Sequence, residues 1–173
     1  NWATGAVTDR SGRGNTGTIV NMATTSAQAI GKIGQALNFD GVSSAINIGN
    51  TISGIQTVGF WIKIATSSQK IIDLNGTASI EAISGTITAN NFTSPTIYVD
   101  GIVASTIDTN WHQVTVITGT GISGSAITIG KIGGSLNGLL DDVRVYNYAL
   151  SASDVNKLYK SGFAKFNVPS TKS

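Results

Sequence analysis

Apolar and polar residues alternate in short runs along most of the chain. The clearest run is 57–65, TVGFWIKIA, in which every second residue from Val58 to Ile64 is apolar. Five further runs have the same period, at residues 45–49, 96–101, 111–119, 125–134 and 139–147. A period of two places alternate side chains on opposite faces, as in a β-strand buried on one side. The pattern therefore predicts an all-β protein.

Turn and helix signals complete this picture. Asn-Gly and Asp-Gly pairs, which adopt positive φ at low cost, predict tight turns at 75–76, 100–101 and 137–138. A single helix is predicted over residues 151–162, SASDVNKLYKSG. Ser151 is its N-cap, Asp154 completes the capping box three residues later, and Gly162 ends the helix. We expect an antiparallel β-sandwich with one short C-terminal helix.

Composition narrows the classes of function. The chain has 173 residues, the size of one domain, and only 12% of them are charged, against about 25% in typical soluble proteins. This surface of uncharged polar residues favours an extracellular or cell-surface location. The net charge of +2 is small and its lysines are scattered, so nucleic acid is not an expected partner. With no cysteine, disulfides and thiol chemistry are excluded, and no apolar run is long enough to predict a transmembrane segment.

The ordered motifs resemble a known family. They are GKIGQALNFDGVSSAINIGN (31–50), TVGFWIKI (57–64), IYVDG (97–101), WHQVTV (111–116) and LNGLLDDVRVYNYALSASDVNKLY (136–159). In this order they are similar to the LamG-like jelly-roll domain of the concanavalin A-like lectin/glucanase superfamily. The resemblance implies two packed antiparallel sheets with loops at their rims. We expect the jelly-roll domain to span residues 1–162 and a C-terminal arm to span 163–173.

The start of the chain departs from this family. Members open with an apolar strand before the loop that matches TDRSGRGNTG (8–17), whereas here only residues 1–8 precede it, with Trp2 the sole large apolar side chain among them. The first family strand is thus expected to be missing, which leaves backbone groups and a groove in the core without a partner. The C-terminal arm, a separate segment or a neighbouring subunit would fill this gap.

The acidic residues argue against an enzyme. Hydrolases of related fold use clustered glutamates, and retaining chemistry needs two carboxyls about 5–5.5 Å apart. Glu81 is the one glutamate and has no acidic neighbour within seven residues. Asp141 and Asp142 are adjacent, so on a regular strand they point to opposite faces. His112 is the one histidine and is assigned a structural role. We expect a protein without catalytic residues.

Calcium is the candidate cofactor. Relatives hold a structural calcium between an N-terminal loop and acids of the last strand, and by matching position the ligands here would be Asp9, Asn15 and one of Asp141 or Asp142. The alternative is that Asp9 caps its own turn and that the two later aspartates accept hydrogen bonds from the backbone or from Arg144.

Strand parity makes a further prediction about these two acids. Asp141 has the parity of Val143 and Val145, which predicts that it points inward and needs a buried partner. Asp142 shares the other face with Arg144, which predicts a hydrogen-bonded pair at the surface.

Two aromatic residues are candidates for ligand contact. Trp61 lies on the face of its strand opposite to the apolar residues, and Phe92 lies in the loop sequence NNFTSPT. An exposed ring in either place would give a sugar a surface to stack on.

Three functions remain open from the sequence. The first is an extracellular binding or adhesion module of a surface protein, with a glycan or a surface protein as its ligand. The second is a structural subunit of a pilus-like surface filament, in which neighbouring subunits supply the missing strand. The third is a carbohydrate-binding module of a glycoside hydrolase.

Overall fold

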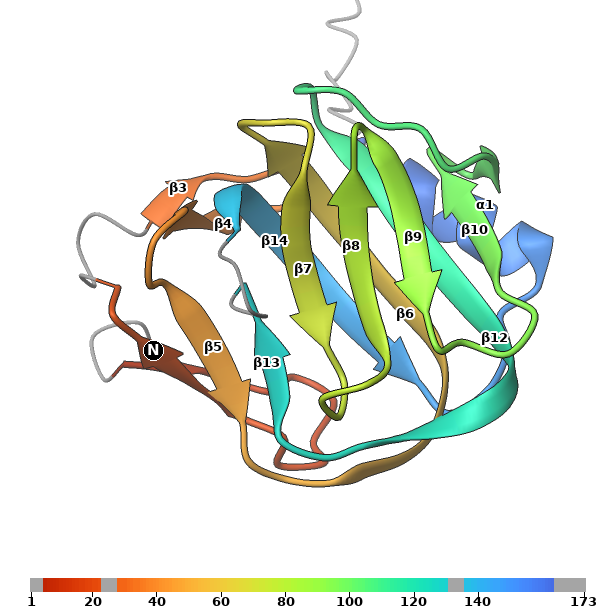
Figure 1. The fold of residues 1–173 in the computed structure, drawn as a ribbon, viewed down its shortest axis with the longest axis horizontal. Helices are drawn as coiled ribbons and strands as arrows, with labels where there is room; N and C mark the ends of the chain where they lie inside the picture. The colour runs from red at the N-terminus through yellow and green to blue at the C-terminus, as the bar shows by residue number, and fades with distance from the viewer. Residues whose placement is uncertain (1–4, 23–27, 131–135, 164–173) are drawn as a thin grey trace, which may run out of the picture.

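The computed structural model describes residues 5–22, 28–130 and 136–163, and within them fourteen strands form two stacked sheets (Figure 1). Sheet A contains, in spatial order, β1 (Ala6–Val7), β2 (Gly17–Val20), β5 (Ala45–Ile48), β13 (Ile127–Ile129), β7 (Gln69–Asp73), β8 (Ser79–Ile83) and β9 (Thr86–Asn90). Sheet B contains β11 (Ile102–Val103), β10 (Thr96–Val99), β12 (His112–Gly124), β6 (Ile52–Ile64), β14 (Asn137–Tyr146), β4 (Gln35–Asp40) and β3 (Gln28–Ile30). Helix α1 (Ala152–Ser161) packs outside sheet B. The predicted antiparallel sandwich with one short helix is confirmed.

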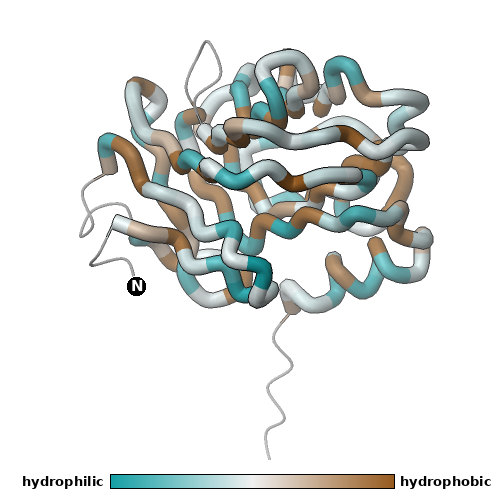
Figure 2. Tube along the Cα trace, turned by 90° about the horizontal axis from the view of Figure 1, so that it is seen from below, coloured by the Kyte–Doolittle hydropathy of each residue, from teal (hydrophilic) through white to brown (hydrophobic). Residues whose placement is uncertain are grey.

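Apolar and polar residues alternate along the strands, which Figure 2 shows as brown and teal segments that follow one another along the tube. In sheet A the two kinds form separate rows. One row of cross-strand partners is apolar and consists of Ile19, Ile46, Ile129, Ile72, Ile80 and Ala89. The adjacent row is entirely polar and consists of Thr18, Asn47, Thr128, Asp73, Ser79 and Asn90. We call this second row the polar row. The isoleucine row packs against sheet B, so the polar row lies on the outer face of sheet A.

Strand β6 forms the centre of sheet B between β12 and β14. Its predicted apolar face, Val58, Phe60, Ile62 and Ile64, is buried with at most 2% of any side chain exposed. The period-two prediction for this segment is therefore confirmed.

Helix α1 also follows its predicted signals. Ser151 accepts a hydrogen bond from the Asp154 backbone N–H at 3.2 Å and donates one to the Asp154 carboxylate at 2.7 Å. Gly162 ends the helix for a different reason from the one expected. Its backbone is right-handed, with φ −74°, but a Cβ there would collide with the Trp61 ring. Close packing, and not a left-handed turn, requires this glycine.

The Gly-containing pairs have different outcomes. Asp100 and Gly101 have φ of +54° and +83° and form the tight turn between β10 and β11, as predicted. The turn predicted at Asn137-Gly138 is wrong, because both residues lie in β14, opposite Asp40 and Phe39. A Cβ on Gly138 would collide with the Lys63 carbonyl oxygen, so the approach of β6 explains the glycine.

The single histidine joins three chain segments at one end of sheet B. His112 Nδ1 lies 2.8 Å from the Asp100 carboxylate and Nε2 lies 3.0 Å from that of Asp108. Burial of the ring opposes its charged form, but the hydrogen bonds to Asp108 and Asp100 outweigh this effect and raise the pKa of His112.

This histidine predicts a pH-dependent part of the stability. Because its folded pKa is raised above about 6.5, its contribution is fully present below that pH and is lost as the pH rises through the folded pKa. Thermal melts of wild type and His112→Gln between pH 5.5 and 8.5 should differ most at the acid end, by roughly 0.5–1 kcal/mol. A difference that stayed constant across this range would contradict the assignment.

Candidate ligand-binding groove

Strand β14 is paired on both sides only in its first half. β4 pairs with Asn137–Leu140, whereas β6 continues to pair as far as Tyr146. Within the described part of the chain, no strand lies against residues 142–146 on the side away from β6. We call residues 142–146 the free edge. An edge of this kind presents backbone N–H and C=O groups that another extended chain can pair with.

A β-bulge begins the free edge. The register with β6 shifts between Asp141, opposite Trp61, and Arg144, opposite Gly59. Asp142 lies in this bulge with φ +48°, a left-handed conformation that is uncommon outside glycine.

The bulge makes the parity prediction for Asp141 wrong. Leu140 lies opposite the buried Ile62 and points inward, so Asp141 shares the outer face with Trp61. The extra residue in the bulge then returns Val145 to the inner face, opposite Val58. Asp141 is nevertheless buried, with 7% of the residue exposed, because the 31–34 turn covers it from outside.

The predicted partner for Asp141 is present in that turn. Its Oδ2 accepts the backbone N–H of Ile33 at 2.6 Å, which ties the β3–β4 turn to β14. Burial raises the pKa of Asp141. Asp142 instead pairs with Arg144 at 2.8 Å on the partly exposed side, as predicted.

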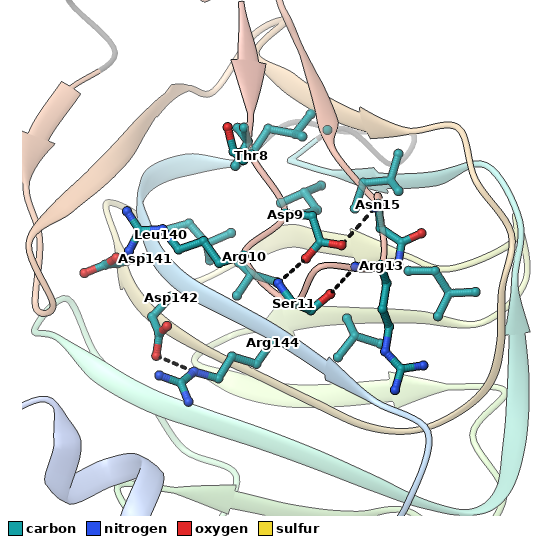
Figure 3. A pocket seen from close by; sticks show the side chains of 18 of the residues that line it. Thr8, Asp9, Arg10, Ser11, Arg13, Asn15, Leu140, Asp141, Asp142 and Arg144 are labelled. Carbon is teal, nitrogen blue, oxygen red and sulfur yellow. Dashed lines mark hydrogen bonds and ion pairs between the residues drawn. The ribbon is translucent and has the colours of Figure 1, made fainter. Parts of the chain in front are cut away.

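A groove of about 1550 Å³ runs beside the free edge between the two sheets (Figure 3). Its floor is apolar and contains Ile46, Ile129, Leu37 and Phe39. Half-buried apolar side chains, Val7, Ile48, Ile52, Val143 and Val145, line its walls and pack against the core. The rim is charged, with Arg10, Arg13 and Arg144 on the groove together with Asp9, Asp141 and Asp142. The groove thus combines an apolar interior with a strand edge.

The 8–16 loop lines this groove and is organised around Asp9. The two carboxylate oxygens of Asp9 accept the backbone N–H groups of Ser11 at 2.8 Å and Asn15 at 2.9 Å (Figure 3). Hydrogen bonds from Ser11, through its side chain and its backbone, together with that from Asn15, lower the pKa of Asp9. Asp9 therefore caps its own loop, which was the alternative to calcium binding.

The four candidate calcium ligands all line the groove but do not form a ligand set. In Figure 3, Asp141 points away from Asp9 and Asp142 points to Arg144. Among the described residues, no three acidic or histidine side chains converge as metal ligands. Calcium binding stays a prediction, and this arrangement of carboxylates does not fit it.

Chelation tests that prediction directly. An ion bound only to the folded state would raise its melting temperature. With Asp9 satisfied by its own loop, we expect melting temperatures in millimolar calcium and in excess EDTA to agree within about 1 °C. A calcium-dependent rise that is absent in Asp9→Asn would show that the loop rearranges around an ion.

The two candidate aromatic residues are both buried. Trp61 is 2% exposed because α1 covers it, with Tyr159 stacked at 5.8 Å and Phe163 edge-on at 6.4 Å. Lys32 lies 5.3 Å from the same ring. Phe92 is 8% exposed and belongs to the core. Neither ring offers a free face to a sugar, so the structure gives both a packing role.

The single glutamate also has a structural environment. Glu81 is 5% exposed, forms an ion pair with Lys70 and accepts a hydrogen bond from Asn90 at 2.6 Å. The residues opposite Glu81 on β7 and β9 are Lys70 and Thr88, so no second carboxyl faces it across either strand. Glu81 therefore links β8 to its neighbours β7 and β9 through Lys70 and Asn90.

The sequence did not predict the main features of the groove. Val143, Val145 and Tyr148 line it, but as a strand sequence they look like ordinary alternation. No local pattern marks where β4 stops pairing along β14.

Comparison with known proteins agrees with this fold. Residues 82–156 match the family model Laminin_G_3, described as the concanavalin A-like lectin/glucanases superfamily. No curated protein matches the chain. The matched segment runs from β8 through β14 into α1 and includes the free edge. In the part of the chain that the structure describes, no helix is long and apolar enough to cross a membrane. The matched segment, which covers less than half of the chain, and the two antiparallel sheets are similar to the concanavalin A-like lectin/glucanase superfamily, a class that suggests a carbohydrate- or protein-binding module.

Proposed function

We propose that this chain is a non-catalytic binding module of a cell-surface protein, and that it holds a protein ligand in the groove beside β14. The groove carries this proposal, because it joins an unpaired strand edge to an apolar interior. A glycan has no backbone amides to pair with the edge and few apolar groups to fill the interior. An extended peptide has both, and strand addition is an established mode of peptide recognition.

The composition of the chain and of its outer face supports the proposed location at the cell surface. The chain is poor in charge, and its outer face on sheet A is built from hydroxyl, amide and carboxylate groups. Such a surface suits a protein exposed outside the cell. Catalysis is not part of the proposal, because Glu81, Asp141 and Asp142 each have a separate structural partner.

Amide hydrogen exchange of the full chain tests peptide binding. The probe is a nine-residue peptide in which threonine and valine alternate, and the control has the same composition with its valines adjacent. We expect the alternating peptide to slow exchange at Val143–Tyr146 at least tenfold more than the control does. Equal exchange with the two peptides would overturn the proposal.

A second candidate is glycan binding on the polar row. It is favoured by the uninterrupted run of polar partners across six strands, from Thr18 to Asn90. Affinity electrophoresis on a panel of polysaccharides would show retardation that is lost in Asn47→Ala. Asn38→Ala, an exposed asparagine on β4 of the other sheet, is the matched control. Absence of retardation on every polysaccharide would remove this candidate.

A further inference from the structure

We propose that the groove takes residues 164–168 of a second copy of this chain as a strand antiparallel to β14. This inference rests on the proposed function, because it names the partner of the same groove. It makes each chain both donor and acceptor, and repetition of this head-to-tail contact builds an open filament.

The acceptor has a defined length and face. The free edge, residues 142–146, offers five residues to a partner. The added strand would lie in line with β4, which ends its pairing at Leu140, and would continue the antiparallel order of sheet B. Side chains on its inner face would contact Ile48 and Val145, which are only half-buried without a partner. Covering them removes apolar surface from water.

The donor sequence has matching features. Residues 164–168 read AKFNV, so Phe166 and Val168 fall on one face and Lys165 and Asn167 on the other. Pro169 follows directly, and a proline cannot donate to a strand ladder, so pairing would end there. The segment therefore has the five residues that the free edge can pair with, and two apolar side chains for the groove.

The position of Phe163 argues for a second copy. Phe163, the last described residue, packs on Trp61 with Lys32 4.7 Å from its ring. Trp61 lies opposite Asp141 across the β6–β14 pair, so Phe163 lies near the Asp141 end of the free edge. A strand antiparallel to β14 must start at the Tyr146 end of the free edge. For five residues, that end lies roughly 17 Å from the Asp141 end. Phe166 follows Phe163 by three residues, and three residues span at most about 10 Å. This reach is shorter than the distance to the Tyr146 end. A chain therefore cannot fill its own groove in the antiparallel direction.

Two full-length variants distinguish the donor segment from the acceptor groove. The variant with Phe166→Ser and Val168→Ser loses the donor side chains and keeps the groove, and Ser170→Ala with Thr171→Ala is its matched control. In sedimentation velocity we expect wild type and the control to associate as concentration rises. The donor-deficient variant should remain monomeric.

A peptide then tests the contact itself. The peptide FAKFNVPSTKS should slow hydrogen exchange at Val143–Tyr146 of the donor-deficient variant. The same peptide with Phe166 and Asn167 exchanged places its apolar residues on opposite faces and should bind at least tenfold more weakly.

The remaining outcomes overturn the inference in distinguishable ways. If the alternating threonine–valine peptide protects the free edge but FAKFNVPSTKS does not, the groove binds peptides and the second copy is not its partner. If neither protects it, the proposed function fails as well. A wild-type chain that is monomeric at every concentration, with its free edge already protected, would show that a segment of the same chain fills the groove.

Discussion

Replacing Trp61 with alanine should lower the free energy of unfolding by about 3–5 kcal/mol, the range for large aromatic residues removed from a core. Trp61 is 2% exposed and is surrounded by Tyr159, Phe163 and the Nζ of Lys32, which lies 5.3 Å from its ring. Alanine would leave a cavity between β6 and α1 that these neighbours cannot fill together. For a chain of this length, the melting temperature should fall by roughly 6–20 °C in calorimetry.

Two other aromatic substitutions define what this result means. Trp61→Phe keeps a ring under α1 and removes the indole N–H, which has no hydrogen-bond partner among the described residues, so its effect should be smaller. Tyr148→Ala, at a residue that is 53% exposed, should change the melting temperature by less than about 2 °C. If Trp61→Ala left the melting temperature unchanged and abolished retardation on a polysaccharide, Trp61 would instead be a residue on which a sugar stacks.

Replacing Asp141 with alanine should cost about 1–3 kcal/mol, because the Ile33 N–H would lose its acceptor under the 31–34 turn. The turn also carries Lys32, which lies against the Trp61 ring. The losses of unfolding free energy in Asp141→Ala and Trp61→Ala should therefore not be additive in the double variant. Asp141→Asn retains an acceptor oxygen and should cost less. Chemical denaturation of the three proteins at pH 7 measures both differences.

The pH dependence of the Asp141 effect has a definite sign. Burial raises the folded pKa of this acid above its unfolded value of about 3.8, so the folded state binds the proton more tightly. The favourable contribution is present below the unfolded pKa and is lost as the pH rises through the folded pKa. Wild type should therefore lose stability relative to Asp141→Asn as the pH rises from about 4 through the folded pKa. A difference that grew in favour of wild type over this range would contradict the burial argument.

Much of the fold follows from local alternation. The apolar face of β6 and the cap of α1 were predicted correctly because each depends on residues within one strand or one helical turn. The pattern did not predict the short strands β1, β3 and β11, since two or three residues are too few for a period to be recognised. The predicted runs also did not include β2, β4, β7, β8 and β9.

The candidate site was predictable only in part. For Asp9 the structure shows the hydrogen-bonded cap that the sequence left open as the alternative to calcium. The parity prediction for Asp141 failed, because one extra residue in a bulge reverses the face of every residue before it. Phe92 was expected in a loop at the surface and is instead part of the core. Each of these errors concerns a contact between segments far apart in the chain.

The sequence by itself determined the all-β class, the single helix and the scarcity of paired acids, because period, capping and composition are local properties. Tertiary structure alone decided which residues are covered and which edges stay open. Trp61 is hidden because α1 returns over it, and Gly162 is required by that approach and not by its own φ. The free edge of β14 exists because β4 stops pairing at Leu140 while β6 continues to Tyr146, and no local pattern encodes where a neighbouring strand ends.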